Sequence, residues 1–126
     1  MGTDADHSPK DVVREFIARM NSGGDPWALL SDAAVVAVNG TTPLSGRYPG
    51  VELIRGILVA TARVVLASLA VNINAMIGTG SRIAALLNIS GRTVAGAAFN
   101  EEGRPCGCVF SVNGGLIHEV VLFPDT

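Results

Sequence analysis

The spacing of apolar residues changes along the chain from a helical period to a strand period. In the first part, apolar side chains recur every three or four residues, as Val12, Phe16 and Met20 do, which is the spacing of one helix face. In the second part they alternate with other residues, as in a half-buried strand. The pattern predicts helices at residues 9–20, 25–30 and 51–62, and strands at residues 34–38, 65–77, 82–89, 93–100, 105–112 and 116–123.

Turn-forming residues separate these segments and set the order of the fold. Residues 40–50 hold three glycines and two prolines, which predict a loop with one short extended piece. Ser90 and Gly91 predict a break between strands, and the Asn-Gly-Gly sequence at residues 113–115 predicts a hairpin. Helices that precede a series of antiparallel strands are typical of an α+β domain, with the helices packed on one face of a strongly curved sheet.

The size and charge of the chain exclude several classes of protein. Its 126 residues fit one domain, which we expect at residues 9–126 after a flexible N-terminus at residues 1–8. A net charge of −2 gives no reason to expect binding to nucleic acid. Arg63 and Asn72 interrupt the longest apolar stretch, so we expect no membrane span. The polar N-terminus has no apolar signal core, which favours a cytoplasmic protein.

The middle of the chain is poor in groups that transfer protons. From Gly56 to Asn100 there is no Asp, Glu or His, although these residues form the predicted walls of any pocket. General acid–base catalysis needs a titratable side chain within hydrogen-bond reach of the reacting atom. The chemistry available in such a pocket is therefore limited.

The two cysteines, Cys106 and Cys108, point to the same face of a predicted strand and are badly placed for a disulfide. His7 and His118 are the only histidines, so a four-coordinate metal site lacks ligands. We expect the cysteines to be small buried apolar residues in a reducing compartment, with no metal and no cofactor.

Four short motifs, in order along the chain, resemble those of one family. They are the helix exit at residues 21–23 (NSG), the loop at residues 43–50 (PLSGRYPG), the start of the last strand at residues 115–119 (GLIHE), and residues 123–126 (FPDT). Together they resemble the SnoaL-like and ketosteroid-isomerase-like branch of the nuclear transport factor 2-like superfamily, over nearly the whole chain. The resemblance implies an α+β cone, in which three helices from the N-terminal half pack on the concave face of a strongly curved antiparallel (mixed) sheet around an apolar pocket.

In this family the pocket hosts isomerases, polyketide cyclases, epoxide hydrolases and dehydratases, and also domains without chemistry. The resemblance places the isomerase Tyr at Phe16, the proton-shuttling Asp within a residue or two of Ala37, and the late-strand Asp at Cys108. The acidic residue of the polyketide cyclases falls at Leu122. None of these positions keeps a carboxyl or phenol group, and the Asp-Arg-Asp set of the epoxide hydrolases has no counterpart. The usual mechanisms are therefore disfavoured.

Two polar side chains remain as catalytic candidates. His118 alternates with Val120, so we expect it on the pocket face as the one base that titrates near neutral pH; the alternative is a structural residue at the rim. Asn39 is expected on the same face as Ala37, where its amide could orient a carbonyl; the alternative is a cap on its own backbone. Cys108 would be a nucleophile only if a neighbour lowered its pKa.

The expected ligand-binding residues of the pocket are Phe16, Met20, Trp27, Ala37, Tyr48, Ile57, Met76, Cys106, Cys108, Val120 and Leu122. One hypothesis is a small enzyme of isomerase, cyclase or hydrolase type that acts on a hydrophobic cyclic or polyketide-like substrate. The other is a non-catalytic module that binds a small hydrophobic molecule or dimerises. The arginines among the acid-free strands favour a homodimer through the convex sheet face, where acids of the second copy can pair with them.

Overall fold

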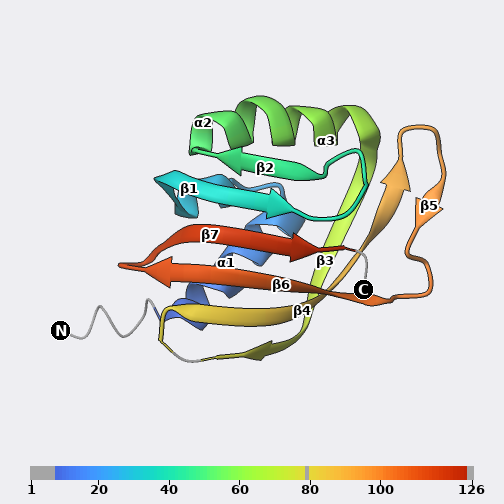
Figure 1. Ribbon diagram of the computed structural model, residues 1–126. Helices are drawn as coiled ribbons and strands as arrows, with labels where there is room; N and C mark the ends of the chain where they lie inside the picture. The colour runs from blue at the N-terminus through green and yellow to red at the C-terminus, as the bar shows by residue number, and fades with distance from the viewer. Residues whose placement is uncertain (1–7, 79, 125–126) are drawn as a thin grey trace.

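The computed structural model describes residues 8–78 and 80–124, so residues 1–7 of the predicted flexible N-terminus lie outside the described part. Helices occupy the first half of the chain, and most of the sheet follows (Figure 1). The elements are α1 (Pro9–Ser22), η2 (Pro26–Leu29), β1 (Leu30–Val38), β2 (Gly46–Pro49), α2 (Val51–Leu53), η3 (Ile54–Val59), α3 (Ala60–Val65), β3 (Leu66–Ile77), β4 (Arg82–Thr93), β5 (Ala98–Phe99), β6 (Pro105–Asn113) and β7 (Leu116–Phe123).

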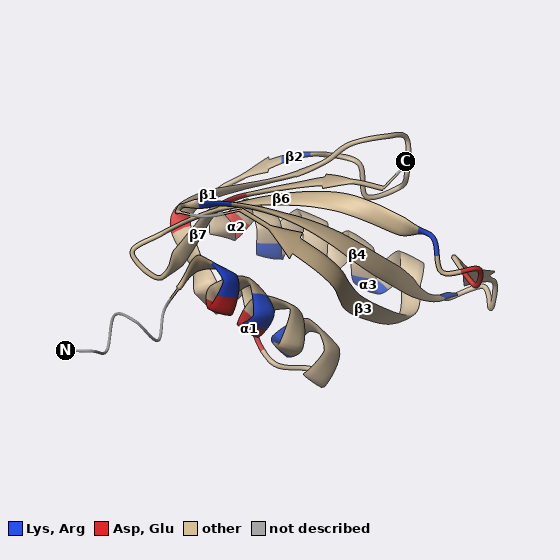
Figure 2. Ribbon diagram, turned by 90° about the horizontal axis from the view of Figure 1, so that it is seen from below, with Lys and Arg blue, Asp and Glu red and all other residues tan. Residues whose placement is uncertain are grey.

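The strands form one mixed sheet in the order β2-β1-β7-β6-β4-β3, and β5 pairs with β4. β1 and β7 are parallel, and the other neighbours are antiparallel. The sheet curls into a half-barrel, and α1 lies on its concave side (Figure 2). The predicted α+β fold with a curved mixed sheet is confirmed. We call the end with the β3–β4 and β6–β7 turns the closed end, and the end with the β1–β2 loop and β5 the open end.

Helix α1 forms because its ends are capped and its apolar residues fall on one face. The Ser8 hydroxyl accepts a hydrogen bond from the backbone N–H of Asp11 at 3.3 Å, and Gly23 adopts the left-handed conformation (φ 80°) that ends the helix. The buried residues of α1 are Val12, Val13, Phe16 and Ile17. This apolar face is the one that packs on the sheet.

Asn21, in the last turn of α1, fastens the helix to the edge strand β3. Its side-chain amide donates to the carbonyl oxygen of Val71 at 2.6 Å, and its side-chain oxygen accepts from the N–H of Val71 at 2.9 Å. The side chain thus pairs with β3 as a neighbouring strand would. In the NSG motif at the helix exit, Asn21 therefore has a structural role, which is to attach α1 to β3.

The predicted third helix is present but is not a regular α-helix throughout. It continues from Val51 to Val65, and its middle, η3, has the wider turns of a π-helix. Ile54 and Leu58 are buried on its inner side. The helix therefore supplies a second apolar wall facing the sheet.

The predicted break at Ser90 and Gly91 is wrong, because β4 runs through both residues to Thr93. Gly91 is opposite Leu69 of β3, and a Cβ at this position would overlap the carbonyl group of Ser68. Glycine is present because β3 and β4 approach closely here, rather than because the chain turns. The strand predicted at residues 93–100 is also wrong, except for Thr93 at the end of β4 and the two residues of β5.

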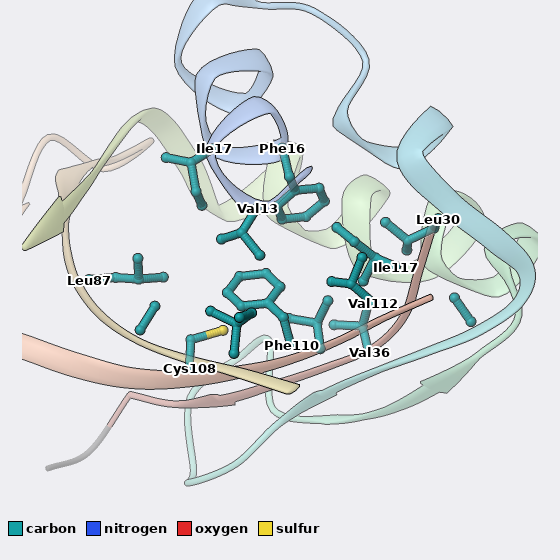
Figure 3. Packing of buried hydrophobic residues seen from close by; sticks show 14 of the residues in the cluster. Val13, Phe16, Ile17, Leu30, Val36, Leu87, Cys108, Phe110, Val112 and Ile117 are labelled. Carbon is teal, nitrogen blue, oxygen red and sulfur yellow. The ribbon is translucent and has the colours of Figure 1, made fainter. Parts of the chain in front are cut away.

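Buried side chains of α1, β6 and β7 pack together in the core (Figure 3). Phe16 of α1 points toward Phe110 of β6, with ring centroids 5.9 Å apart and an edge-to-face angle of 73°. Phe110, Ile117 and Val13 are fully buried. Such packing of apolar side chains supplies most of the stability of a domain of this size.

Candidate functional site

A cavity of about 1000 Å³ opens on the concave side of the sheet, toward the open end. The helix from Val51 to Val65 forms one wall, through Leu58, Val59 and Ala62. α1 and η2 form the opposite wall, and strands β1, β4, β6 and β7 form the floor. The volume is at the upper end of the range of about 300–1000 Å³ that small-molecule sites occupy.

The floor of the cavity is apolar because alternate residues of each strand point inward. β6 contributes Cys106, Cys108 and Phe110, and β1 contributes Val36 and Val38. These side chains are buried or nearly so, while their neighbours along each strand face the convex side. Two cysteine thiols are thus the only heteroatom-bearing side chains among these inward positions.

The structure places seven of the expected ligand-binding residues in the cavity lining: Phe16, Met20, Trp27, Cys106, Cys108, Val120 and Leu122. They come from α1, η2, β6 and β7, which are far apart in the sequence. Trp27 packs edge-to-face on Phe16, with ring centroids 5.6 Å apart, at the side of the cavity. Trp27 is the only tryptophan of the chain, so its emission reports on this site.

His118 does not share the cavity face with Val120, and that prediction is wrong. Ile117 pairs with Val112, but the next pair across β6 and β7 is Glu119 with Ser111, which leaves His118 as an extra residue in β7. Such a bulge interrupts the alternation of side chains along the strand. His118 is exposed, and its Nε2 lies 3.1 Å from the carbonyl oxygen of Asn113, to which it donates a hydrogen bond.

The expected orientation of Ala37 and Asn39 toward the pocket is also wrong. Val36 and Val38 line the cavity, so the residues that alternate with them point to the opposite face. Within a residue or two of Ala37, the positions of β1 that face the cavity are Val36 and Val38, which carry no titratable group. The sequence predicts that side chains of this strand alternate between two faces, but it does not show which of the two sets faces the cavity.

Three further expected residues lie outside the cavity lining. The hydroxyl of Tyr48 donates to the carbonyl oxygen of Leu44 at 2.8 Å and holds the β1–β2 loop. Ile57 is half exposed, because the turns of η3 direct the next two residues of the helix inward instead. Met76 packs on the core from the far part of β3, beyond an irregularity in pairing between Ile73 and Ala75.

Polar residues that sequence reasoning missed gather at the mouth of the cavity: Thr42, Arg63, Ser68, Thr93, Asn100, Glu102 and Arg104. They lie on the β1–β2 loop, the α3–β3 junction, the end of β4 and the loop before β6. Asn100 organises that last loop from a left-handed backbone conformation (φ 53°). Its side chain accepts from the N–H of Arg104 at 2.8 Å and donates to the carbonyl oxygen of Ile89, also at 2.8 Å.

The electrostatics of the cavity floor disfavour a thiolate. Burial raises the pKa of the Cys108 thiol well above its usual range, and the neighbouring Cys106 raises it further. Burial also raises the pKa of Cys106. Both groups are neutral thiols at physiological pH, so Cys108 lacks the activation that a nucleophile needs. Over residues 8–78 and 80–124, no three His, Cys, Asp or Glu side chains cluster as a metal site.

The sequence matches no protein-family model and no curated protein. Solved structures match nearly all of it at low identity. A nuclear transport factor 2-like protein of unknown function from Burkholderia pseudomallei is 16% identical, with a TM-score of 0.79 over 90% of this chain and 88% of that one. A protein with a ketosteroid isomerase-like fold from Catenulispora acidiphila, in complex with trimethylamine, is 14% identical, with a TM-score of 0.72 over 89% and 83%.

TerC, co-crystallised with polyporic acid, is 14% identical to this chain, with a TM-score of 0.76 over 93% of this chain and 91% of that one. These likenesses show that the chain has the nuclear transport factor 2-like fold of the SnoaL-like and ketosteroid-isomerase-like kind. The fold expected from the four motifs is confirmed. In the described part of the chain, no helix has the length and apolar character needed to cross a membrane.

Proposed function

We propose that this protein binds a small hydrophobic molecule in the open-end cavity without acid–base chemistry on it. The observation that carries the proposal is the composition of the cavity floor, where apolar side chains and two neutral thiols occupy the inward positions. An apolar cavity of this volume favours a ligand with a large hydrophobic body. A proton donor or acceptor at the reacting atom, which the isomerase mechanism needs, has no counterpart on the floor.

A second candidate is an enzyme of cyclase, isomerase or hydrolase type that acts on a hydrophobic cyclic or polyketide-like substrate. It is favoured by TerC, a structural neighbour that was co-crystallised with polyporic acid. In this chain the chemistry would depend on groups at the mouth, such as Glu102, because the floor supplies none. We expect His118→Ala to leave both binding and turnover unchanged, since His118 lies outside the cavity lining.

The proposal is tested by titrating the purified protein with Nile red while following the emission of Trp27. A saturable change at one equivalent per chain supports a binding site, because Trp27 lines the cavity. A linear, non-saturating change contradicts it. The ligand that co-purifies with the protein, identified by native mass spectrometry, is then added back and recovered. Recovery with its mass and structure unchanged supports binding alone, and conversion to a product favours the enzyme.

We also propose that a second copy of this chain covers the convex face of the sheet. Outward residues in register across four strands are apolar there: Ala84 pairs with Val109, Val109 with Val121, and Val121 with Ala37. Arg82 and Glu119 carry opposite charges on the adjoining row, on either side of Ser111. A self-complementary apolar face with both charges at its edge suits a two-fold dimer.

Sedimentation velocity tests this arrangement. We expect the wild-type protein to sediment as a dimer and the Val121→Arg variant as a monomer, because an arginine in the centre of the face would be buried without a partner. Arg47→Glu, at the rim of the same face, is the control and should change the dimer little. A monomeric wild-type protein at micromolar concentration contradicts the proposal.

A further inference from the structure

We propose that the mouth of the cavity binds the carboxylate of an amphipathic ligand, with Arg63 as its counter-charge. This inference rests on the proposed binding function and adds the chemical class of the ligand. It predicts a hydrocarbon body against the floor and a single anionic head group at the open end.

Arg63 is a cation at the mouth of the cavity for which the described residues provide no ionic partner. It lies in the last turn of α3 and lines the cavity. Over residues 8–78 and 80–124, no ion pair or side-chain hydrogen bond joins Arg63 to another residue. By contrast, Arg14, Arg19 and Arg55 each pair with an acidic side chain within 3.0 Å. The sequence explains the difference, because no acidic residue occurs between Gly56 and Asn100, where the elements around Arg63 lie.

The charge at the mouth has the opposite sign to that of the whole chain. Among residues 8–78 and 80–124, the charged side chains that line the cavity are Arg63, Arg104 and Glu102, which together carry one positive charge, whereas the chain carries −2. The Oε2 atom of Glu102 lies 3.8 Å from the Nε atom of Arg104. The two opposite charges therefore largely cancel in their effect on a ligand. The excess charge therefore falls on Arg63, and the hydroxyl of Ser68, on the same rim, is a neutral donor for the second oxygen of an anion.

A carboxylate on a hydrophobic body fits this arrangement better than a small anion does. Arg63 is exposed, so its attraction for a free ion is screened by water and salt. A ligand whose apolar part enters the cavity brings its head group to the mouth, where the guanidinium can bind both oxygens of a carboxylate. A competing role for Arg63 is purely structural, since a cation at a helix C-terminus stabilises the helix.

The experiment compares decanoate with 1-decanol, which share a hydrocarbon body and differ in charge. Dissociation constants are measured from Trp27 emission, below the micelle concentration, for the wild type, Arg63→Gln and the control Arg14→Gln. Arg14 is exposed on α1, outside the cavity lining. We expect wild-type protein and Arg14→Gln to bind decanoate about three- to tenfold more tightly than 1-decanol at low salt. In Arg63→Gln this preference should vanish while 1-decanol binding is retained.

The two proposals fail in different ways. If neither compound binds the wild type, the hydrophobic binding function is wrong, and the inference fails with it. If both bind equally, or if Arg63→Gln keeps the preference for decanoate, the cavity binds apolar bodies but Arg63 is a structural residue. Arg63→Lys keeps the charge without the planar fork, so it should retain part of the preference. The preference for decanoate should also disappear in about 0.5–1 M salt, because the Debye length then falls to about 3–4 Å and the charge of Arg63 is screened.

Discussion

The closed and open ends of the half-barrel are made from the same strands but differ in how the concave side is filled. At the closed end, Ile83 and Ile117 are 1% and 0% exposed and belong to the same buried core as the apolar face of α1. At the open end, Leu69 of β3 is 41% exposed and lines the cavity. Asn21 fastens the end of α1 to Val71, so residues 66–70 of β3 extend past the helix. The closed end is thus filled by packed side chains, whereas the cavity that we propose as the binding site opens toward the other end of the sheet.

This division means that stability and ligand affinity can be changed separately. Ile117 of the closed end contributes apolar burial to folding and lies outside the cavity lining, whereas Phe110 belongs to both the core and the cavity. An exposed lining residue of the open end, such as Leu69, contributes less burial, so replacing it should cost little folding free energy. The following predictions test this separation, in decreasing order of the expected effect on stability.

Ile117→Ala should be the most destabilising of the changes considered. Ile117 is fully buried at the closed end and does not line the cavity, so its truncation leaves a void that only partly relaxes. We expect the free energy of unfolding in urea to fall by about 2–5 kcal/mol. Leu116→Ala, one residue away and 39% exposed, is the matched control and should cost much less. Equal losses in the two variants would show that the closed end is not the packed core.

Asn21→Ala should destabilise the boundary between the two ends. The change removes both side-chain hydrogen bonds to Val71 and leaves a backbone N–H and carbonyl of the edge strand without this partner. We expect a loss of about 1–3 kcal/mol in urea unfolding, and faster amide exchange along the first half of β3. Asn21→Asp can still accept from the N–H but cannot donate to the carbonyl oxygen, so its amide exchange should be intermediate. Ser22→Ala is the control on the exposed side of the same turn, and a loss as large as that of Asn21→Ala would argue against the anchor.

The buried thiol of Cys108 should make the protein less stable at alkaline pH. Its pKa is raised in the folded state above the ordinary value of 9.0. Above pH 9.0 the unfolded chain therefore releases this proton while the folded chain keeps it, and unfolding is favoured by up to about 1.4 kcal/mol per pH unit. Below pH 9.0 the contribution is constant. Urea unfolding of Cys108→Val, compared with the wild type from pH 8 to 10, isolates this slope from other groups, and parallel curves would contradict it.

The sequence placed residues correctly in elements where apolar side chains repeat at a regular helical or strand spacing without a bulge. The apolar stripe of α1 and the alternation of β6 put Phe16, Cys106 and Cys108 in the cavity wall. The fold could be predicted because four motifs in order constrain the whole topology. The absence of Asp, Glu and His between Gly56 and Asn100 also predicted a cavity poor in proton-transfer groups.

His118 was misplaced because a local irregularity changes the phase of its strand. One extra residue in β7 turns His118 outward, although Val120 and Leu122 follow it at alternate positions. Bulges depend on the register with a partner strand, which is a tertiary property. The mouth of the cavity was missed for a similar reason, because Arg63 and Arg104 are brought to one opening only by the curl of the sheet.

Ala67→Phe should affect ligand binding strongly and stability least. Ala67 is exposed in the free protein and lines the cavity near its mouth, so a phenyl ring there would occupy space needed by the ligand. We expect the dissociation constant for Nile red to rise about tenfold or more, with a change in unfolding free energy within about 0.5 kcal/mol. Ala70→Phe, on the same strand and also exposed, lies outside the cavity lining and is the matched control for the added ring. If both variants bind as the wild type does, the ligand occupies another surface, and the division of the sheet into a packed end and a binding end is wrong.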